Sequence, residues 1–150
     1  MPGASISYFG YMCGRFTQAF TWNEVIEFYR LLDEIAPALT PSWNVAPTHP
    51  ANTIVLEESA FRTRRMQWGL IPFWAKDPSI GSKLINARAE TLAEKPAFRH
   101  ALKSRRCAIP ISGFYEWQKL ERAKQPFFVK GSKAVWETFP EAITQVPFMK

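Results

Sequence analysis

The sequence predicts an α+β fold with a β-rich, barrel-like core of short strands and a few flanking helices. Apolar residues make up 47% of the 150 residues, enough to bury a core without disulfides. Twelve prolines are spread along the chain and favour short elements separated by turns. Several short runs have the composition of strands, and many short strands are typical of a barrel or a sandwich.

The first expected element is a helix that begins after Thr21. Thr21 and Glu24 form a capping-box pattern, and apolar residues then recur at helical spacing. These apolar residues are Trp22, Val25, Ile26, Tyr29 and Leu32. Pro37 and Pro41 follow, and we expect them to end the helix and open an irregular stretch.

The remaining elements are mostly strands bounded by turn residues. In chain order, strands are expected at 53–58, 64–70, 106–112, 113–119 and 126–131, with one helix at 96–103 that has Pro96 in its first turn. Within 113–119, alternation places Phe114 and Glu116 on one face and Tyr115 and Trp117 on the other.

Composition narrows the class of protein. Lys and Arg number 19 against 13 Asp and Glu, and the net charge of +6 favours an anionic partner such as nucleic acid. No apolar run is long enough to suggest a membrane span, and the first residues do not form a clear signal peptide. We therefore expect a soluble cytoplasmic protein with no membrane partner.

The cysteines, histidines and absent motifs exclude several kinds of chemistry. The sequence contains no Gly-rich phosphate loop, no HExxH and no GxSxG. Cys13, Cys107, His49 and His100 are not paired at zinc-site spacing, so we expect no metal and no cofactor. Cys107 lies in an apolar run, where a small buried hydrophobic side chain is the better interpretation.

Four segments are specific as an ordered set. They are MCGRF at 12–16, WGLIPFWA at 68–75, INARAET at 85–91 and GFYEW at 113–117, with WNVAPT at 43–48 between the first two. This order resembles the SOS response-associated peptidase family, also called abasic-site processing proteins, over about residues 12–129. The resemblance implies a β-rich fold that senses abasic sites in single-stranded DNA and crosslinks itself to them in the DNA-damage response.

The resemblance implies that Cys13, which follows Met12, is the reactive residue once it becomes N-terminal. An abasic sugar opens to an aldehyde, with which the α-amine can form a Schiff base. The thiolate can then close a thiazolidine ring. Reference pKa values of about 8 for the amine and about 8.5 for the thiol leave usable fractions of both nucleophiles near neutral pH.

Two further residues match catalytic positions of the family. Asn86 matches its active-site asparagine, whose amide can hydrogen-bond the sugar or the cysteine without adding charge. Glu116 matches its glutamate, which can carry a proton during sugar opening and imine formation. Taken alone, Asn86 would be interpreted as a turn residue and Glu116 as an exposed strand carboxylate.

Other matches suit a DNA-binding groove. Arg15 and Arg88 are the expected phosphate contacts. The candidates for stacking on bases, or for wedging at a strand–duplex junction, are Pro47, Trp68, Trp74 and Trp117. For at least one of these tryptophans we expect core packing instead. Arg62, Arg64 and Arg65 add a basic stripe, for which a solvated strand face is an equally good interpretation.

Two departures from the family pattern affect the expected activity. While residues 1–12 are attached, the nitrogen of Cys13 is an amide and cannot form a Schiff base. We therefore interpret 1–11 as a leader or an overcalled start before a single domain at 12–150. Neither His49 nor His100 matches the family's H-x-R-M-P histidine, which indicates a C-terminally truncated member. Incomplete burial of Phe127, Phe128 and Trp136 would then favour self-association.

The leading hypothesis is thus an enzyme-like sensor that forms a thiazolidine with abasic single-stranded DNA. Three alternatives remain open. The chain could bind single-stranded DNA without covalent chemistry, it could be a cysteine peptidase that removes its own leader, or it could be an inactive truncated member.

Overall fold

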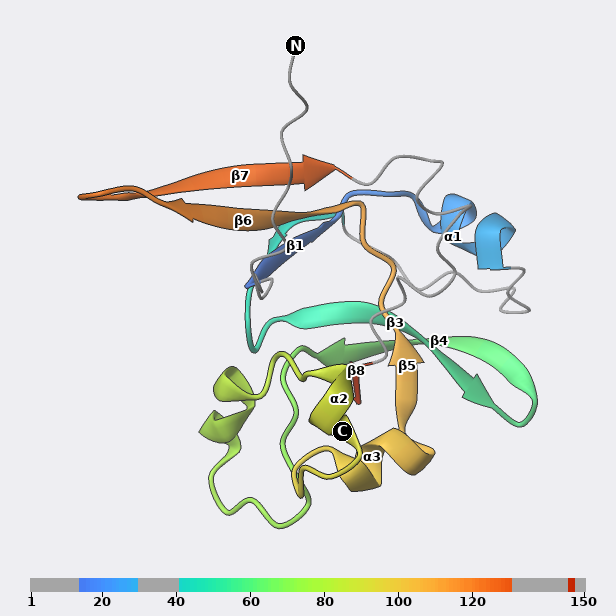
Figure 1. The fold of residues 1–150 in the computed structure, drawn as a ribbon. Helices are drawn as coiled ribbons and strands as arrows, with labels where there is room; N and C mark the ends of the chain where they lie inside the picture. Colours follow the sequence, from blue (N-terminus) through green and yellow to red (C-terminus); the bar gives the residue numbers. More distant parts are fainter. Residues whose placement is uncertain (1–13, 30–40, 131–145, 148–150) are drawn as a thin grey trace.

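The computed structural model describes residues 14–29, 41–130 and 146–147, and it places the strands among them in two sheets. The strand orders are β2-β1-β6-β7 and β4-β3-β5-β8. Figure 1 shows the sheets as two layers, with the short helices α2 and α3 beside the second sheet.

The first sheet joins strands that are far apart in the sequence. Its members are β1 (Arg15–Gln18), β2 (Ser42–Val45), β6 (Gly113–Lys119) and β7 (Lys124–Lys130). All pair antiparallel, with Phe16 opposite both Phe114 in β6 and Val45 in β2. The β1–β2 register then shifts, so that Gln18 lies opposite Ser42. Two steps along β1 therefore match three along β2, which is a β-bulge in β2.

The second sheet is built on a long hairpin. Its members are β3 (Pro50–Glu57), β4 (Ala60–Gln67), β5 (Arg106–Ala108) and β8 (Val146–Pro147). Glu58 and Ser59 connect β3 to β4 with φ angles of 48° and 66°. Two positive φ angles in a two-residue loop give a turn whose twist matches that of the flanking strands.

The helices are short and lie in the segments that connect the strands. They are α1 (Trp22–Tyr29), the 3-10 helix η1 (Pro78–Lys83), α2 (Ala89–Leu92) and α3 (Arg99–Ser104). The predicted capping box of α1 is confirmed. The backbone N–H of Thr21 donates to the Glu24 carboxylate (2.6 Å), and the N–H of Glu24 donates to the Thr21 hydroxyl (3.4 Å).

The largest core cluster lies between the two sheets. Its buried members are Phe16, Val45, Ala51, Val55, Trp68, Cys107 and Ile109. Burial of Cys107 confirms its interpretation as a small hydrophobic side chain. A second cluster packs Val25 of α1 on Ile54 of β3, and a third packs Leu70 against α3.

The α+β, β-rich prediction is confirmed, but the described strands form two open sheets and do not close into a barrel. Strand 113–119 matches β6 residue for residue. The run 106–112 was expected to continue as a strand, but β5 ends at Ala108. Pro110 lacks an N–H for a sheet ladder, and its carbonyl accepts a hydrogen bond from the Gln18 side chain (2.9 Å) instead.

One other strand and one helix also have a boundary that differs from the predicted residue. The run 64–70 was expected to end at Leu70, but β4 ends at Gln67 because Gly69 adopts φ 127° and turns the chain. The helix expected from Pro96 begins at Arg99, after a turn. Within the described residues, no helix is long and apolar enough to cross a bilayer.

Candidate functional site

The end of β1 lies against β6, where two of the predicted site residues are found. Arg15, the first residue of β1, is opposite Tyr115, the residue before Glu116. A Cβ added to Gly14 would lie 3.9 Å from Cζ3 of Trp117. Cys13 lies outside the described residues and is joined to Gly14 by a peptide bond. The backbone next to Cys13 is therefore beside Trp117 and one residue from the Arg15–Tyr115 pair.

Glu116 is a partly buried carboxylate on the core-facing side of β6. Strand alternation places it on the same face as Phe114, which packs against the main core cluster. Desolvation by burial raises the pKa of Glu116, and a hydrogen bond from the Trp117 backbone partly offsets this rise. A raised pKa brings the carboxyl group closer to the range in which it can both accept and return a proton.

Asn86 lies in the loop between η1 and α2. Residues 68–70, which we call the WGL segment, form hydrogen bonds with the two residues just before Asn86. The N–H of Leu70 donates to the carbonyl of Leu84 (3.0 Å), and the indole Nε1 of Trp68 donates to the carbonyl of Ile85 (3.2 Å). Ile85 itself packs against the main core cluster, and Asn86 is half-buried. The position of Asn86 is thus fixed through its neighbour in the chain.

Trp68 connects this loop to β1. Only 3% of Trp68 is exposed, and its ring meets that of Phe16 edge-on with centroids 4.8 Å apart. Its backbone also bonds the 46–49 loop, because its carbonyl accepts from the N–H of Thr48 (2.8 Å) and its N–H donates to the carbonyl of His49 (2.9 Å). The expectation that Trp68 stacks on bases is therefore not met, and core packing is the interpretation that applies.

The WGL segment needs glycine for this arrangement. Gly69 has φ 127°, and a Cβ there would lie 2.3 Å from the carbonyl oxygen of Gly81. No side chain fits at that distance, and the positive φ disfavours one independently. The close approach of these two backbones brings η1 and the loop that follows it onto the WGL segment.

The opposite face of the first sheet carries aromatic rings, of which Trp43 and Phe128 are exposed and Tyr115 and Trp117 are half-buried. Tyr115 lies 5.1 Å from Phe128 and 6.5 Å from Trp117 between ring centroids, and its hydroxyl donates to the carbonyl of Trp43 (3.2 Å). Trp43 is 65% exposed. Arg15 donates from Nη1 to the side-chain oxygen of Asn44 (2.7 Å) at the same edge. We call Trp43, Tyr115, Trp117 and Phe128 the aromatic face.

The sequence prediction included Trp117 in this group but missed Trp43, Tyr115 and Phe128. The alternation within 113–119 does place Tyr115 with Trp117, so that signal was present. Trp43 faces outward through the β2 bulge, which no local pattern predicts. Phe127 and Phe128 are 47% and 43% exposed, in line with the expected incomplete burial, whereas Trp136 lies outside the described residues.

The other predicted DNA contacts come from loops rather than from the sheet. Trp74 is 49% exposed in the segment between β4 and η1, where its neighbour Phe73 is 76% exposed. Arg88 is exposed at the start of α2, and Pro47 is half-buried between β2 and β3. The structure therefore places Arg15, Glu116 and Trp117 on paired strands, with Glu116 on the core-facing side and Arg15 and Trp117 on the opposite face.

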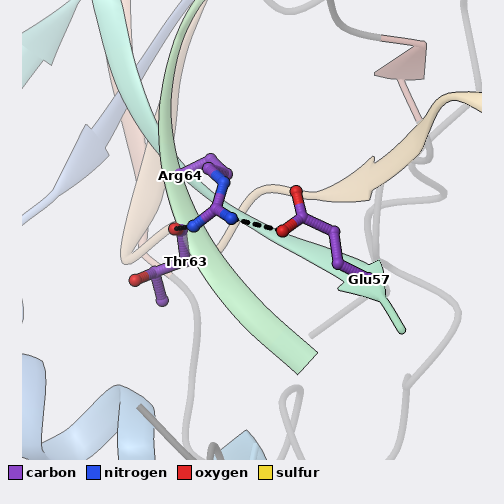
Figure 2. A network of polar contacts seen from close by, with 3 residues as sticks. All are labelled: Glu57, Thr63 and Arg64. Atoms are coloured by element: carbon purple, nitrogen blue, oxygen red, sulfur yellow. Dashed lines mark hydrogen bonds and ion pairs between the residues drawn. The ribbon is translucent and has the colours of Figure 1, made fainter. Parts of the chain in front are cut away.

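The predicted basic stripe separates into two kinds of arginine. Figure 2 shows the Arg64 guanidinium between the Thr63 carbonyl, to which it donates (2.9 Å), and the Glu57 carboxylate, with which it forms an ion pair. Arg65, next in the chain, is exposed and lies opposite Asn52 in the hairpin. Within the described ranges, no three His, Cys, Asp or Glu side chains are grouped as a metal site would require.

Comparison with known proteins identifies one family of relatives. Residues 12–140 match the family model described as SOS response associated peptidase (SRAP). The chain is 48% identical over 122 residues to the abasic site processing protein YoqW of Bacillus subtilis, covering 79% of this chain and 54% of YoqW. It is 36% identical over 103 residues to the abasic site processing protein HMCES of Rattus norvegicus, covering 59% of this chain and 29% of HMCES.

Solved structures show the same fold. A protein from Bacteroides thetaiotaomicron matches with a TM-score of 0.67 and 24% identity, covering 81% of this chain and 55% of that chain. A phage-related protein from Bordetella bronchiseptica matches with a TM-score of 0.63 and 25% identity, covering 80% of this chain and 56% of that chain. The chain spans about half the length of the bacterial relative and of these structures.

Proposed function

Because the chain belongs to the SOS response-associated peptidase family, we propose that it recognises abasic sites in single-stranded DNA and becomes covalently linked to them through Cys13. The observation that carries this proposal is the position of Gly14: a Cβ there would lie 3.9 Å from Trp117, and the next residue, Arg15, pairs with Tyr115, the neighbour of Glu116. Cys13 is bonded to Gly14. The names of the relatives, abasic site processing proteins, support the same class of substrate.

The proposed reaction needs Cys13 as the first residue. Its α-amine adds to the aldehyde carbon of the opened sugar, and the resulting carbinolamine loses water to give an imine. The thiolate then adds to the imine carbon, the nitrogen takes up a proton, and a thiazolidine ring closes. The reaction forms one C–N bond and one C–S bond and releases one water, so it needs no oxidant or reductant.

Glu116 is the proposed proton carrier for these steps. Both the loss of water and the final protonation of nitrogen require a group that can give and accept a proton near neutral pH. Burial already raises the pKa of Glu116 in that direction. Asn86 is the proposed neutral hydrogen-bonding group for the sugar or the cysteine, because an amide can donate and accept without adding charge.

The aromatic face and Arg15 are proposed to hold the DNA strand. Exposed rings can stack on bases of any sequence, and the chain carries a net charge of +6 that attracts the phosphate backbone. Trp117 belongs both to this face and to the neighbourhood of Gly14, so a base stacked there would be next to the reactive end of the chain.

A second function, binding of single-stranded DNA without a covalent link, is favoured by the exposed rings of Trp43 and Phe128. Stacking of bases on these rings needs no reactive amine or thiol. Such binding would weaken as salt rises and would survive Cys13→Ala.

Intact mass after incubation with single-stranded DNA that carries one abasic site tests the covalent proposal. We expect a version that begins at Cys13 to gain the mass of the DNA less one water, and the Cys13→Ala version to gain nothing. If the version that begins at Cys13 binds the DNA but forms no adduct, non-covalent binding is the function and the covalent proposal is wrong.

A further inference from the structure

A pocket of about 250 Å³ lies where β1, β2 and the β3–β4 hairpin meet. Its lining includes Gln18, Ser42, His49, Asn52 and Arg65. This volume is below the roughly 300–1,000 Å³ of pockets that enclose drug-sized ligands. The pocket therefore suits a small group rather than a whole nucleotide.

The side-chain amide of Gln18 forms the inner wall of the pocket, and its nitrogen and oxygen both have hydrogen-bond partners. Gln18 is 2% exposed, and its Nε2 donates to the carbonyls of Asn52 and Pro110, both at 2.9 Å. Its Oε1 accepts from the backbone N–H (2.9 Å) and the side chain (3.2 Å) of Asn52. These contacts use both donors of the Gln18 amide and two acceptor positions, so Gln18 shapes the pocket without contributing a free donor.

Three other side chains that line the pocket have hydrogen-bond donors that no described residue engages. Within the described part of the chain, no hydrogen bond or ion pair engages the hydroxyl of Ser42, the imidazole of His49 or the guanidinium of Arg65. The β2 bulge puts Ser42 and Val45 on the same side of β2, and both line the pocket. Among the lining residues there is no carboxylate, so the pocket favours an anion over a cation.

Arg64 and Arg65 are adjacent in the chain, but only Arg65 lines the pocket. Successive strand residues point to opposite faces, so Arg64 and Arg65 cannot reach the same side of β4. Arg64 is held by Glu57 and Thr63 (Figure 2), whereas Arg65 lines the pocket beside its cross-strand partner Asn52. Only one of the two adjacent positive charges is available to a ligand here.

We propose that this pocket binds a single phosphate group through Arg65, Ser42 and His49. A guanidinium presents paired N–H donors that match phosphate oxygens, and the hydroxyl and the imidazole N–H add two more donors. Such a group has two possible sources. It is either the backbone phosphate of a bound DNA strand or a free phosphomonoester.

Titration with inorganic phosphate, followed by NMR, tests the pocket directly. At constant ionic strength, we expect saturable shifts of the backbone amides of Ser42 and Arg65 and of the His49 imidazole. Arg65→Gln is expected to weaken this binding at least about tenfold, because it removes a charge-assisted hydrogen-bond donor. Arg64→Gln is the matched control, since it removes the same charge from the adjacent residue, and Ser42→Ala is expected to weaken binding less.

Two results would overturn the proposal. One is the absence of a saturable response at these three residues in the unsubstituted protein. The other is equal weakening by Arg64→Gln and Arg65→Gln, which would indicate a general charge effect. The titration uses neither abasic DNA nor Cys13, so its failure is distinct from failure of the proposed crosslinking.

The source of the phosphate is distinguished by binding undamaged single-stranded DNA over a range of salt concentrations. If the pocket holds a backbone phosphate, Arg65→Gln lowers the slope of log affinity against log salt by about one relative to Arg64→Gln. An unchanged slope, with the phosphate response intact, assigns the pocket to a free phosphomonoester.

Discussion

The indole Nε1 of Trp68 donates to the carbonyl of Ile85 at 3.2 Å, and this bond ties the residue before Asn86 to the core. The same indole packs edge-on against Phe16, whose strand partner is Phe114, two residues before Glu116. One buried side chain thereby links the three segments that carry Cys13, Asn86 and Glu116. We expect its influence on the proposed chemistry to pass through Asn86.

Trp68→Phe keeps a ring on Phe16 but removes the donor to Ile85. Leaving that carbonyl without its partner is expected to lower the free energy of unfolding by about 1–3 kcal/mol, measured by urea denaturation. Crosslinking at saturating DNA is expected to slow several-fold, while affinity for undamaged single-stranded DNA stays within about twofold.

A double-mutant cycle separates positioning of Asn86 from general damage. If Trp68 acts through Asn86, Trp68→Phe slows crosslinking much less in an Asn86→Ala background than in the original chain. Additive effects of the two substitutions would contradict a positioning role and leave only a stabilising one.

Glu116→Gln is expected to slow crosslinking and to flatten its pH dependence, because the amide cannot carry a proton. Although Glu116→Gln slows crosslinking, it is not expected to lower the stability of the fold. Burial raises the pKa of Glu116 in the folded state, so the ionised form destabilises the fold at pH values above that pKa. The variant should therefore melt at least as high as the original protein at neutral pH.

The stability difference should shrink as pH falls through the folded pKa toward and below the ordinary value of 4.5, where Glu116 is protonated in both states. Thermal melts of the two proteins across this pH range check the sign. A variant that is clearly less stable at neutral pH would show that the carboxylate makes a stabilising contact that outweighs its desolvation.

Gly69→Ala places a methyl group 2.3 Å from the carbonyl oxygen of Gly81 and forces a side chain into φ 127°. Because the clash is with backbone, it cannot be relieved by rotating a side chain. We expect a loss of at least about 2 kcal/mol in the free energy of unfolding. Gly14→Ala is the control, since its Cβ meets Trp117 at an ordinary 3.9 Å. Equal losses for the two variants would contradict the proposed backbone contact.

Trp43→Ala tests whether the aromatic face binds DNA. Trp43 is 65% exposed, so its removal should change stability little. Loss of one stacking ring is expected to weaken binding of undamaged single-stranded DNA by about 1–3 kcal/mol. Phe61→Ala is a matched control, because Phe61 is 51% exposed on the second sheet. Equal affinity of the two variants, measured by fluorescence anisotropy, would argue against a DNA-binding role for this face.

Local patterns in the sequence were sufficient to predict several features of the structure. The Thr21–Glu24 capping box, strand 113–119 and the burial of Cys107 were predicted and confirmed. Each depends on composition or on interactions between residues a few positions apart, which periodicity and side-chain chemistry record directly. The ordered motifs likewise identified the family, since they are read from residue identities alone. The domain limits and the roles of Cys13, Asn86 and Glu116 stay predictions.

Tertiary structure decided which role each ambiguous residue takes. Gln18 binds the carbonyl of Pro110 across 92 positions, and Trp68 turns inward to Phe16 and Ile85. Arg64 pairs with Glu57, whereas its neighbour Arg65 lines a pocket. In each case the outcome depends on which distant segment comes to lie beside the residue. A local pattern carries no information about that partner, because the same side chain suits a core, a surface or a ligand site equally well.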